Sequence, residues 1–105
     1  MRLGKVSKHK AEEIIKKAIG YMRSGEYVQG ERHLHDDGKY CALGLIALAA
    51  GFDFEHGYLK RDPYDVAHEV LALFKLDNSI VYKMNDQDHL SFEQISNFLE
   101  NAIKV

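Results

Sequence analysis

The residue of this sequence best suited to nucleophilic chemistry is Cys41, the only cysteine in the chain. It lies in the first turn of a predicted helix, where the amide dipoles favour a thiolate. A thiol nucleophile also needs a base to take its proton and a polar group to orient that base. The candidates are Cys41 as nucleophile, one of His33, His35 or His89 as base, and Asn85 or Asp86 as the orienting group. This set predicts a thiol-dependent hydrolase or transferase.

Packing is the competing explanation for Cys41. Free cysteine is among the residue types most often buried, and the residues around Cys41 match no thiol-protease signature. A chain of 105 residues also leaves little room for a substrate cleft. We therefore favour a structural role for this side chain over a catalytic one.

Two histidines and two aspartates in the sequence His33-Leu34-His35-Asp36-Asp37 form a second candidate site. Alternate residues of a strand face the same side, so the imidazoles of His33 and His35 could share a metal ion with the carboxylate of Asp37. A polar turn that contains two histidines explains the same residues more simply, and we predict no metal site. Gly-rich phosphate-binding loops and a Gly-x-Ser-x-Gly elbow are absent from the sequence, so no cofactor is expected.

Two helices are predicted in the first half of the chain. Apolar residues recur with three-and-four spacing over residues 8–24, where Ser7 can cap the start and Gly25 can end the helix. The segment 40–50 carries no charge; it is too short to cross a bilayer and apolar enough to be buried on all sides. Within it, Gly44 costs roughly 1 kcal/mol relative to alanine, which predicts that another helix approaches closely.

Two further helices are predicted towards the C-terminus. Asp62 and Pro63 mark a helix start, and the apolar stripe that follows should end near residue 76. Ser91 and Gln94 form a capping box ahead of a last apolar stripe. The segments between the helices are a hairpin or an ordered loop within 27–39, a strand or a helical turn at 80–82, and a turn at 85–88.

Together these elements predict a mainly α fold, with about four helices around a buried central helix at 40–50. The whole chain, residues 1–105, is expected to form a single compact domain, with a small β-hairpin near 27–39. Residues 1–7 precede the first helix and are expected to be flexible. The composition agrees, because 46% hydrophobic and 29% charged residues are typical of a globular domain and not of a disordered one.

The composition also indicates where the protein works. One cysteine excludes an intramolecular disulfide, and the basic start of the chain has no apolar stretch behind it, so we expect a cytoplasmic protein without a membrane segment. The first 23 residues carry seven Lys or Arg and two Glu, a net charge of +5, and the rest of the chain carries −7. A basic end suits an acidic partner or a nucleic-acid backbone. Because no Arg-rich cluster with interleaved aromatic residues is present, we favour a solvated helix face and expect no nucleic acid.

Three motifs follow the first helix: Tyr27-Val28-Gln29-Gly30, then Gly38-Lys39-Tyr40-Cys41-Ala42-Leu43-Gly44, then Asn85-Asp86 ahead of Ser91-Phe92-Glu93-Gln94-Ile95. In this order they resemble a family of short, uncharacterised bacterial and bacteriophage proteins. Its members share an aromatic-Gln-Gly segment, a Cys-Ala-Leu-Gly helix and an Asn-Asp pair before the last helix. The chain departs from this pattern at Tyr27 and Met84, where Trp is expected, which indicates that these positions need a bulky packing group.

Polar side chains inside otherwise apolar motifs need hydrogen-bond partners. We therefore expect Asn85 and Asp86 to cap or hydrogen-bond the start of the helix that contains Cys41, or to form the polar side of a small site around it. The binding candidates are Gln29 and Asn85, which the resemblance singles out, and Tyr27 and Tyr40, which belong to a tyrosine-rich group of residues that flanks the central helix and could form a binding surface.

The functional expectation follows from an incomplete catalytic set and a size suited to a binding module. We expect a small binding or accessory protein that acts through another protein, of phage or mobile-element origin, as a monomer or a homodimer. The thiol-dependent enzyme and the His/Asp metal protein are the two alternatives. The enzyme hypothesis predicts that Cys41 is exposed and reactive. The metal hypothesis predicts that the histidines bind a metal ion.

Overall fold

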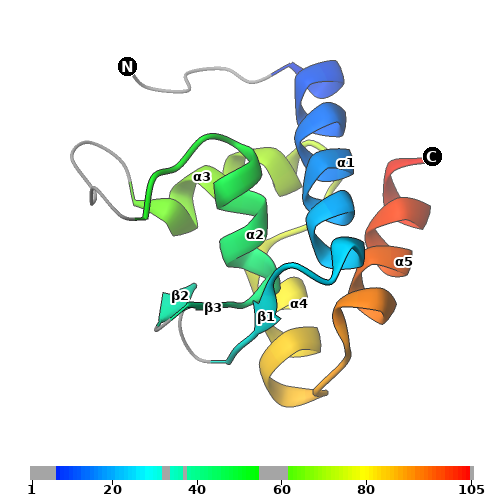
Figure 1. The fold of residues 1–105 in the computed structure, drawn as a ribbon. Coiled ribbons are helices and arrows are strands. Elements are labelled where there is room, and N and C mark those ends of the chain that lie inside the picture. Colours follow the sequence, from blue (N-terminus) through cyan, green and yellow to red (C-terminus); the bar gives the residue numbers. More distant parts are fainter. Residues whose placement is uncertain (1–6, 32–33, 37, 55–61, 105) are drawn as a thin grey trace.

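The computed structural model describes residues 7–31, 34–36, 38–54 and 62–104. These residues form a mainly helical domain with one small sheet (Figure 1). The elements are the helices α1 (Lys8–Ser24), α2 (Ala42–Ala49), α3 (Pro63–Ala72), α4 (Asn78–Tyr82) and α5 (Phe92–Ile103), the π-helix η1 (Lys83–Gln87) directly after α4, and the strands β1 (Val28–Gln29), β2 (His35–Asp36) and β3 (Lys39–Tyr40). The predicted fold class is confirmed. Five helices replace the expected four because the segment around 80–82 is helical.

Helix α2 lies at the centre of the fold (Figure 1). Seven of its eight residues are buried, and it contacts α1, α3 and α4. A charge-free helix can be covered on all sides without removing a charge from water, so the prediction of a buried central helix is confirmed. The helix is shorter than the predicted 40–50 because Tyr40 belongs to β3 and Cys41 is the N-cap.

Helices α1 and α5 lie side by side and run in opposite directions (Figure 1). The Ser7 hydroxyl accepts a hydrogen bond from the Lys10 amide at 3.1 Å and begins α1 as predicted. The capping box of α5 is also confirmed, since the Ser91 hydroxyl accepts from the Gln94 amide and the Gln94 side chain accepts from the Ser91 amide. The stripe that α1 buries consists of Ala11, Ile14, Ile15, Ala18, Ile19 and Met22.

The three strands form one mixed sheet in the order β1-β3-β2. Strands β2 and β3 pair antiparallel, and Gly38 in the turn between them has a φ of 78°, which favours glycine. Strand β1 pairs with β3 in parallel. The hairpin expected near 27–39 is therefore present at 35–40, and the extended residues before Gly30 add a third strand.

Gly44 permits a close approach, but the approaching group is not the helix that was predicted. A Cβ atom at Gly44 would overlap the backbone carbonyl of Leu34. The same carbonyl oxygen accepts a hydrogen bond from the Cys41 amide at 3.3 Å. The segment that leads into β2 therefore rests directly on the first turn of α2, and only glycine leaves room for it.

The turn predicted at 85–88 is wrong, because residues 83–87 form the π-helix η1. The Asp88 amide donates to the Lys83 carbonyl at 2.8 Å, five residues earlier, which is the π-helical hydrogen bond. The wider turn accommodates an extra residue in the helix. Asn85, in the middle of this turn, is only 1% exposed.

Some expectations lie outside the described residues, namely those for residues 1–6, His33 and Asp37. None of the helices in the described ranges is long and apolar enough to cross a membrane. The site must therefore be built from the helices and strands above.

Candidate functional site

The three sequence motifs meet at the side chain of Asn85. Its Oδ1 atom accepts hydrogen bonds from the Ala42 amide at 3.1 Å and from Gln29 Nε2 at 3.0 Å. Its Nδ2 atom donates to the Gly30 carbonyl at 2.8 Å and to Asp86 Oδ1 at 2.7 Å. All four hydrogen-bonding positions of the amide are used. The expectation that Asn85 hydrogen-bonds to the start of the Cys41 helix is confirmed.

Gln29 extends this network to the last helix. Its Nε2 atom also donates to the Leu90 carbonyl at 2.8 Å, and its Oε1 atom accepts from the Phe92 amide at 3.1 Å, the first amide of α5. One side chain on β1 thus links η1, the segment after it and α5. Gln29 and Asn85 were assigned to binding, and the structure shows both amides bonded inside the protein.

Cys41 lies beside this network, and its side chain is only 6% exposed. Burial raises the pKa of the Cys41 thiol to about 11, with a smaller contribution from the negative charge of Asp86, and hydrogen bonds from the Gly44 and Leu43 amides only partly oppose this. The thiol is therefore protonated at neutral pH. In this conformation it is a buried apolar group and a poor nucleophile.

Of the three predicted bases, His33 lies outside the described residues, and His35 and His89 make their contacts away from the thiol. The His35 ring packs against the rings of Tyr40 and Phe54, with centroids 4.6 and 5.4 Å away. The Nδ1 atom of His89 lies 2.6 Å from a carboxylate oxygen of Glu31. Among the described residues, no histidine hydrogen-bonds to Cys41. Of the predicted catalytic residues that are described, only Asp86 is close enough to affect the thiol. The assignment of catalysis to Cys41, His35 and Asp86 stays a prediction.

The two tyrosines assigned to binding form part of an aromatic row. Tyr27 contacts Tyr21 with ring centroids 5.1 Å apart, and it contacts Tyr40 edge-on at 5.5 Å. Both Tyr27 and Tyr40 are partly buried against the core. Their rings therefore hold the sheet against α1, and a binding role for them stays a prediction.

The His/Asp cluster is described only in part. His33 and Asp37 lie outside the described residues, and His35 is enclosed by aromatic rings. Within the part of the chain that is described, no three His, Cys, Asp or Glu side chains are grouped so that they could hold a metal ion. The described part of this cluster therefore gives the metal candidates no support.

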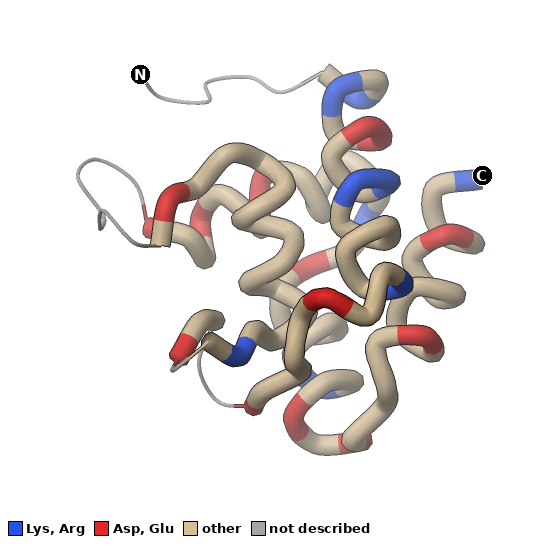
Figure 2. The backbone as a smooth tube through the Cα atoms, in the orientation of Figure 1, with Lys and Arg blue, Asp and Glu red and all other residues tan. Residues whose placement is uncertain are grey.

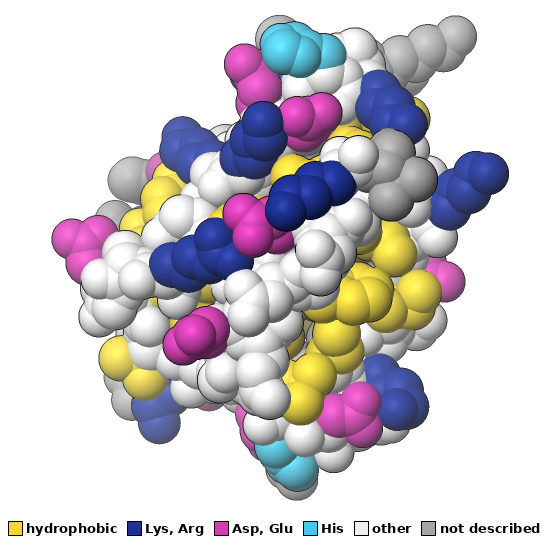
Figure 3. Space-filling view, turned by 90° about the vertical axis from the view of Figure 1, so that its right-hand side faces the viewer, with side chains coloured by type: hydrophobic (Ala, Val, Ile, Leu, Met, Phe, Trp, Pro, Cys, Tyr) yellow, Lys and Arg dark blue, Asp and Glu magenta, His cyan; other side chains and the backbone are white. Residues whose placement is uncertain are grey.

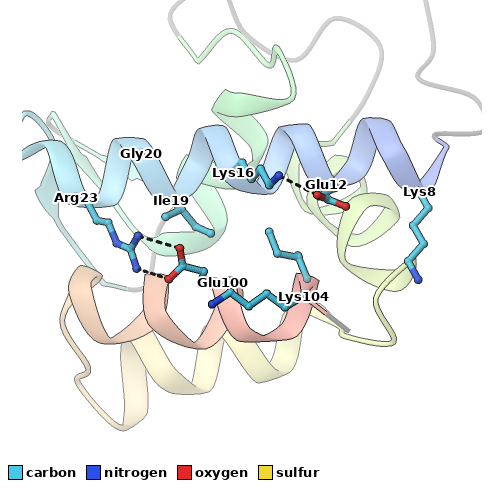
Figure 4. A pocket seen from close by; sticks show the side chains of 9 residues that line it. Lys8, Glu12, Lys16, Ile19, Gly20, Arg23, Glu100 and Lys104 are labelled. Atoms are coloured by element: carbon cyan, nitrogen blue, oxygen red, sulfur yellow. Dashed lines mark hydrogen bonds and ion pairs between the residues drawn. The ribbon is translucent and has the colours of Figure 1, made fainter.

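A groove of about 820 Å³ runs between α1 and α5 (Figure 4). Its apolar part is formed by Ile19 of α1 and Ile103 of α5, which are 6% and 8% exposed. At the end of α1, the Arg23 guanidinium bonds to both carboxylate oxygens of Glu100, at 3.1 and 3.4 Å. The sequence motifs contribute none of the lining, which consists of Lys8, Glu12, Lys16, Ile19, Gly20, Arg23, Glu100, Ile103 and Lys104.

Positive charge exceeds negative charge along this groove. Lys16 pairs with Glu12 at 2.9 Å, and the ammonium and its hydrogen bond lower the pKa of that carboxyl. Arg23 likewise lowers the pKa of Glu100. Neither Lys8 nor Lys104 makes an ion pair with any described residue.

The charge surplus is a property of this side of the molecule. Most of the charged positions on α1 are basic, whereas acidic positions predominate elsewhere (Figure 2). Figure 3 looks onto the side formed by α1 and α5 and shows apolar side chains between basic and acidic ones. The groove is thus an open, partly apolar surface with a cationic rim.

Gly20 is the unusual residue of the groove. It lies inside α1, where glycine costs about 1 kcal/mol relative to alanine. A Cβ atom there would meet nothing within 4 Å, so no contact within the described structure requires glycine. A glycine in the middle of the predicted helix 8–24 is the sequence signal that could have located this groove.

Comparison with known proteins places the chain in a family without assigning an activity. No curated protein and no solved structure gives a significant match. The family whose pattern matches is described as a family of unknown function, DUF6197, and the match covers residues 6–105. This agrees with the resemblance carried by the three motifs that meet at Asn85. Since the match spans nearly the whole chain, the protein belongs to the DUF6197 family.

Proposed function

We propose that this protein is a small cytoplasmic accessory protein that binds another protein through the groove between α1 and α5. The observation that carries the proposal is the groove itself, an open hollow of about 820 Å³ with Ile19 and Ile103 in its lining and two lysines that make no ion pair with a described residue. An origin in phage or mobile elements is part of the same proposal and is based on the motif resemblance.

The way the groove is lined supports a protein partner over a small molecule. Sites for small molecules are usually enclosed and direct a few polar groups at one point. Here the two acidic side chains already pair with their neighbours, Glu12 with Lys16 and Glu100 with Arg23, and these pairs are spread along the groove. An elongated segment fits such a surface better than a compact ligand. The raised pKa of Cys41 also supports binding over thiol chemistry.

A photo-cross-linking experiment tests the proposal directly. The photoreactive residue p-benzoylphenylalanine replaces Glu12, which lines the groove, and in a matched variant it replaces Glu13, the next residue, which lies on the exposed surface and pairs with His9. Both variants are irradiated in the cells that produce the protein. We expect a covalent adduct with another protein from position 12 and none from position 13.

Other results would overturn the proposal. Equal adducts from both positions would mean nonspecific contact. An adduct with the mass of two copies of this chain would make the groove an interface between copies, and a nuclease-sensitive adduct would indicate nucleic acid. A folded Glu12 variant that gives no adduct would show that the groove meets no protein.

A further inference from the structure

The groove contains a helical glycine that the fold does not explain. Gly20 faces the space between α1 and α5, and a methyl group there would touch nothing in the described structure. Gly44 is the contrasting case, because Leu34 fills the space in front of it. A glycine on a helix surface lets another backbone approach closely. The open space in front of Gly20 therefore matches a backbone that comes from outside this chain.

The position of the free cations indicates the charge of that segment. Lys8 begins α1, and its side chain lies at the end of the groove away from Arg23. The side chain of Lys104, which follows α5, extends back along the groove toward Glu100 (Figure 4). The Nζ atom of Lys8 lies 5.5 Å from the centroid of the Phe74 ring and makes no ion pair with a carboxylate of the described residues. Two ammonium groups that make no ion pair with a described residue, at different points of a partly apolar groove, are complementary to carboxylates on the partner.

We propose that the groove binds an acidic amphipathic helix of the partner protein, which crosses α1 at Gly20. This inference rests on the protein-binding function proposed above. The groove extends along α1 from Lys8 to Arg23, about 22 Å, which is the length of about four helical turns. Such a helix would place an apolar stripe over Ile19 and Ile103 and its carboxylates beside the two lysines.

Synthetic peptides provide the probe. Three fluorescein-labelled peptides of about 16 residues are compared. The first is an amphipathic helix with a Leu stripe and Glu flanks, the second has Lys in place of every Glu, and the third keeps the composition of the first with the Leu spacing scrambled. Fluorescence anisotropy against the full-length protein should show binding of the first peptide at lower concentration than either control.

Variants of the protein locate the binding site. Gly20→Leu fills the space between the helices and should weaken binding of the acidic peptide by at least about tenfold. Reversing both free charges, with Lys8→Glu and Lys104→Glu, should weaken it by about five- to tenfold and improve binding of the Lys peptide. The matched control Lys10→Glu, an exposed lysine of α1 outside the groove, should change binding by less than about twofold.

The Gly20 variants carry their own folding control. Leucine and alanine both favour helix over glycine, so Gly20→Leu and Gly20→Ala should raise the thermal midpoint of the free protein. Lost binding in a stabilised variant cannot then be attributed to unfolding. A lowered midpoint would contradict the open space in front of Gly20 and overturn the inference.

The two proposals fail separately. If position 12 cross-links to a protein but the three peptides bind equally, or Gly20→Leu leaves binding unchanged, the acidic-helix inference is wrong and the protein-binding function stands. If neither cross-linking nor peptide binding is seen with folded protein, both proposals are wrong. A preference for the Lys peptide would reverse the assigned charge and also overturn the inference.

Discussion

Replacing Asn85 with alanine tests whether the polar network holds the fold together. The substitution removes the partner of two backbone groups, the Ala42 amide and the Gly30 carbonyl, and one of the two acceptors of the Gln29 amide. Ala42 is fully buried, so its amide cannot form a replacement hydrogen bond with bulk water. The network would therefore lose its centre while α2 keeps its apolar contacts.

The size of the effect follows from the number of orphaned groups. A buried polar group left without a partner costs about 1–3 kcal/mol. Two backbone groups are orphaned, and water that enters the small space left by Asn85 can satisfy part of this cost. We expect the free energy of unfolding to fall by about 3 kcal/mol, which lowers the thermal midpoint by about 12 °C or more in a domain of this size.

Urea unfolding followed by circular dichroism measures this change. Asn101→Ala is the control, because Asn101 is exposed on α5 and its side chain makes no hydrogen bond to a described residue. Its loss should change stability by less than about 0.5 kcal/mol. An Asn85→Ala variant within about 1 kcal/mol of the parent, with an unchanged urea dependence, would refute the view that this network joins the three motifs.

Three further substitutions test single contacts. Gly44→Ala should lower the free energy of unfolding by about 3 kcal/mol or more, since its Cβ overlaps the Leu34 carbonyl, and urea unfolding measures it. The raised pKa of the Cys41 thiol contributes stability that is present below about pH 9 and lost as pH rises through about 11. Relative to Cys41→Ala, urea unfolding should show a loss of about 2 kcal/mol between pH 9 and pH 11. Ser91→Ala should cost about 1 kcal/mol by thermal unfolding, and Ser91→Asp should restore most of it.

The helices were predictable because their signals are local. Helix α1 begins after Ser7 and ends before Gly25, as expected. At the start of α3, the Asp62 side chain accepts a hydrogen bond from the Tyr64 amide. The predicted end of this helix near residue 76 is wrong, because apolar residues continue to position 76 while the helix ends at Ala72. Periodicity shows which residues face the core, and caps show where a helix begins, but neither fixes the last turn of a helix.

The sheet and the π-helix were less predictable because tertiary contacts decide them. Each strand has only two residues, too few to show alternation, and β1 joins β3 across a connection that contains β2. The π-helix at 83–87 looks like a polar turn in sequence. Its wider turn is stabilised by hydrogen bonds between Asn85 and residues more than 40 positions earlier, which no local pattern reveals.

The candidate site also has a part that the sequence predicts and a part that it does not. That Asn85 would hydrogen-bond to the helix containing Cys41 was predictable, because a polar residue in an apolar motif needs a partner and the motif order suggested which one. The groove was not predicted, since it depends on how α1 and α5 lie against each other. Only Gly20, a helix-weakening residue without an internal reason, marks it in the sequence.

The structure also explains why the family motifs reveal no activity. Gln29 and Asn85 bond to one another and to backbone groups, and Gly44 admits Leu34. Residues with these roles define a scaffold, and a scaffold can carry unrelated functions. The groove uses Lys8, Gly20 and Lys104, all outside the motifs. Proteins that share the motifs can therefore differ in this surface, so the proposed binding of a partner is tested with the α1 and α5 of this chain.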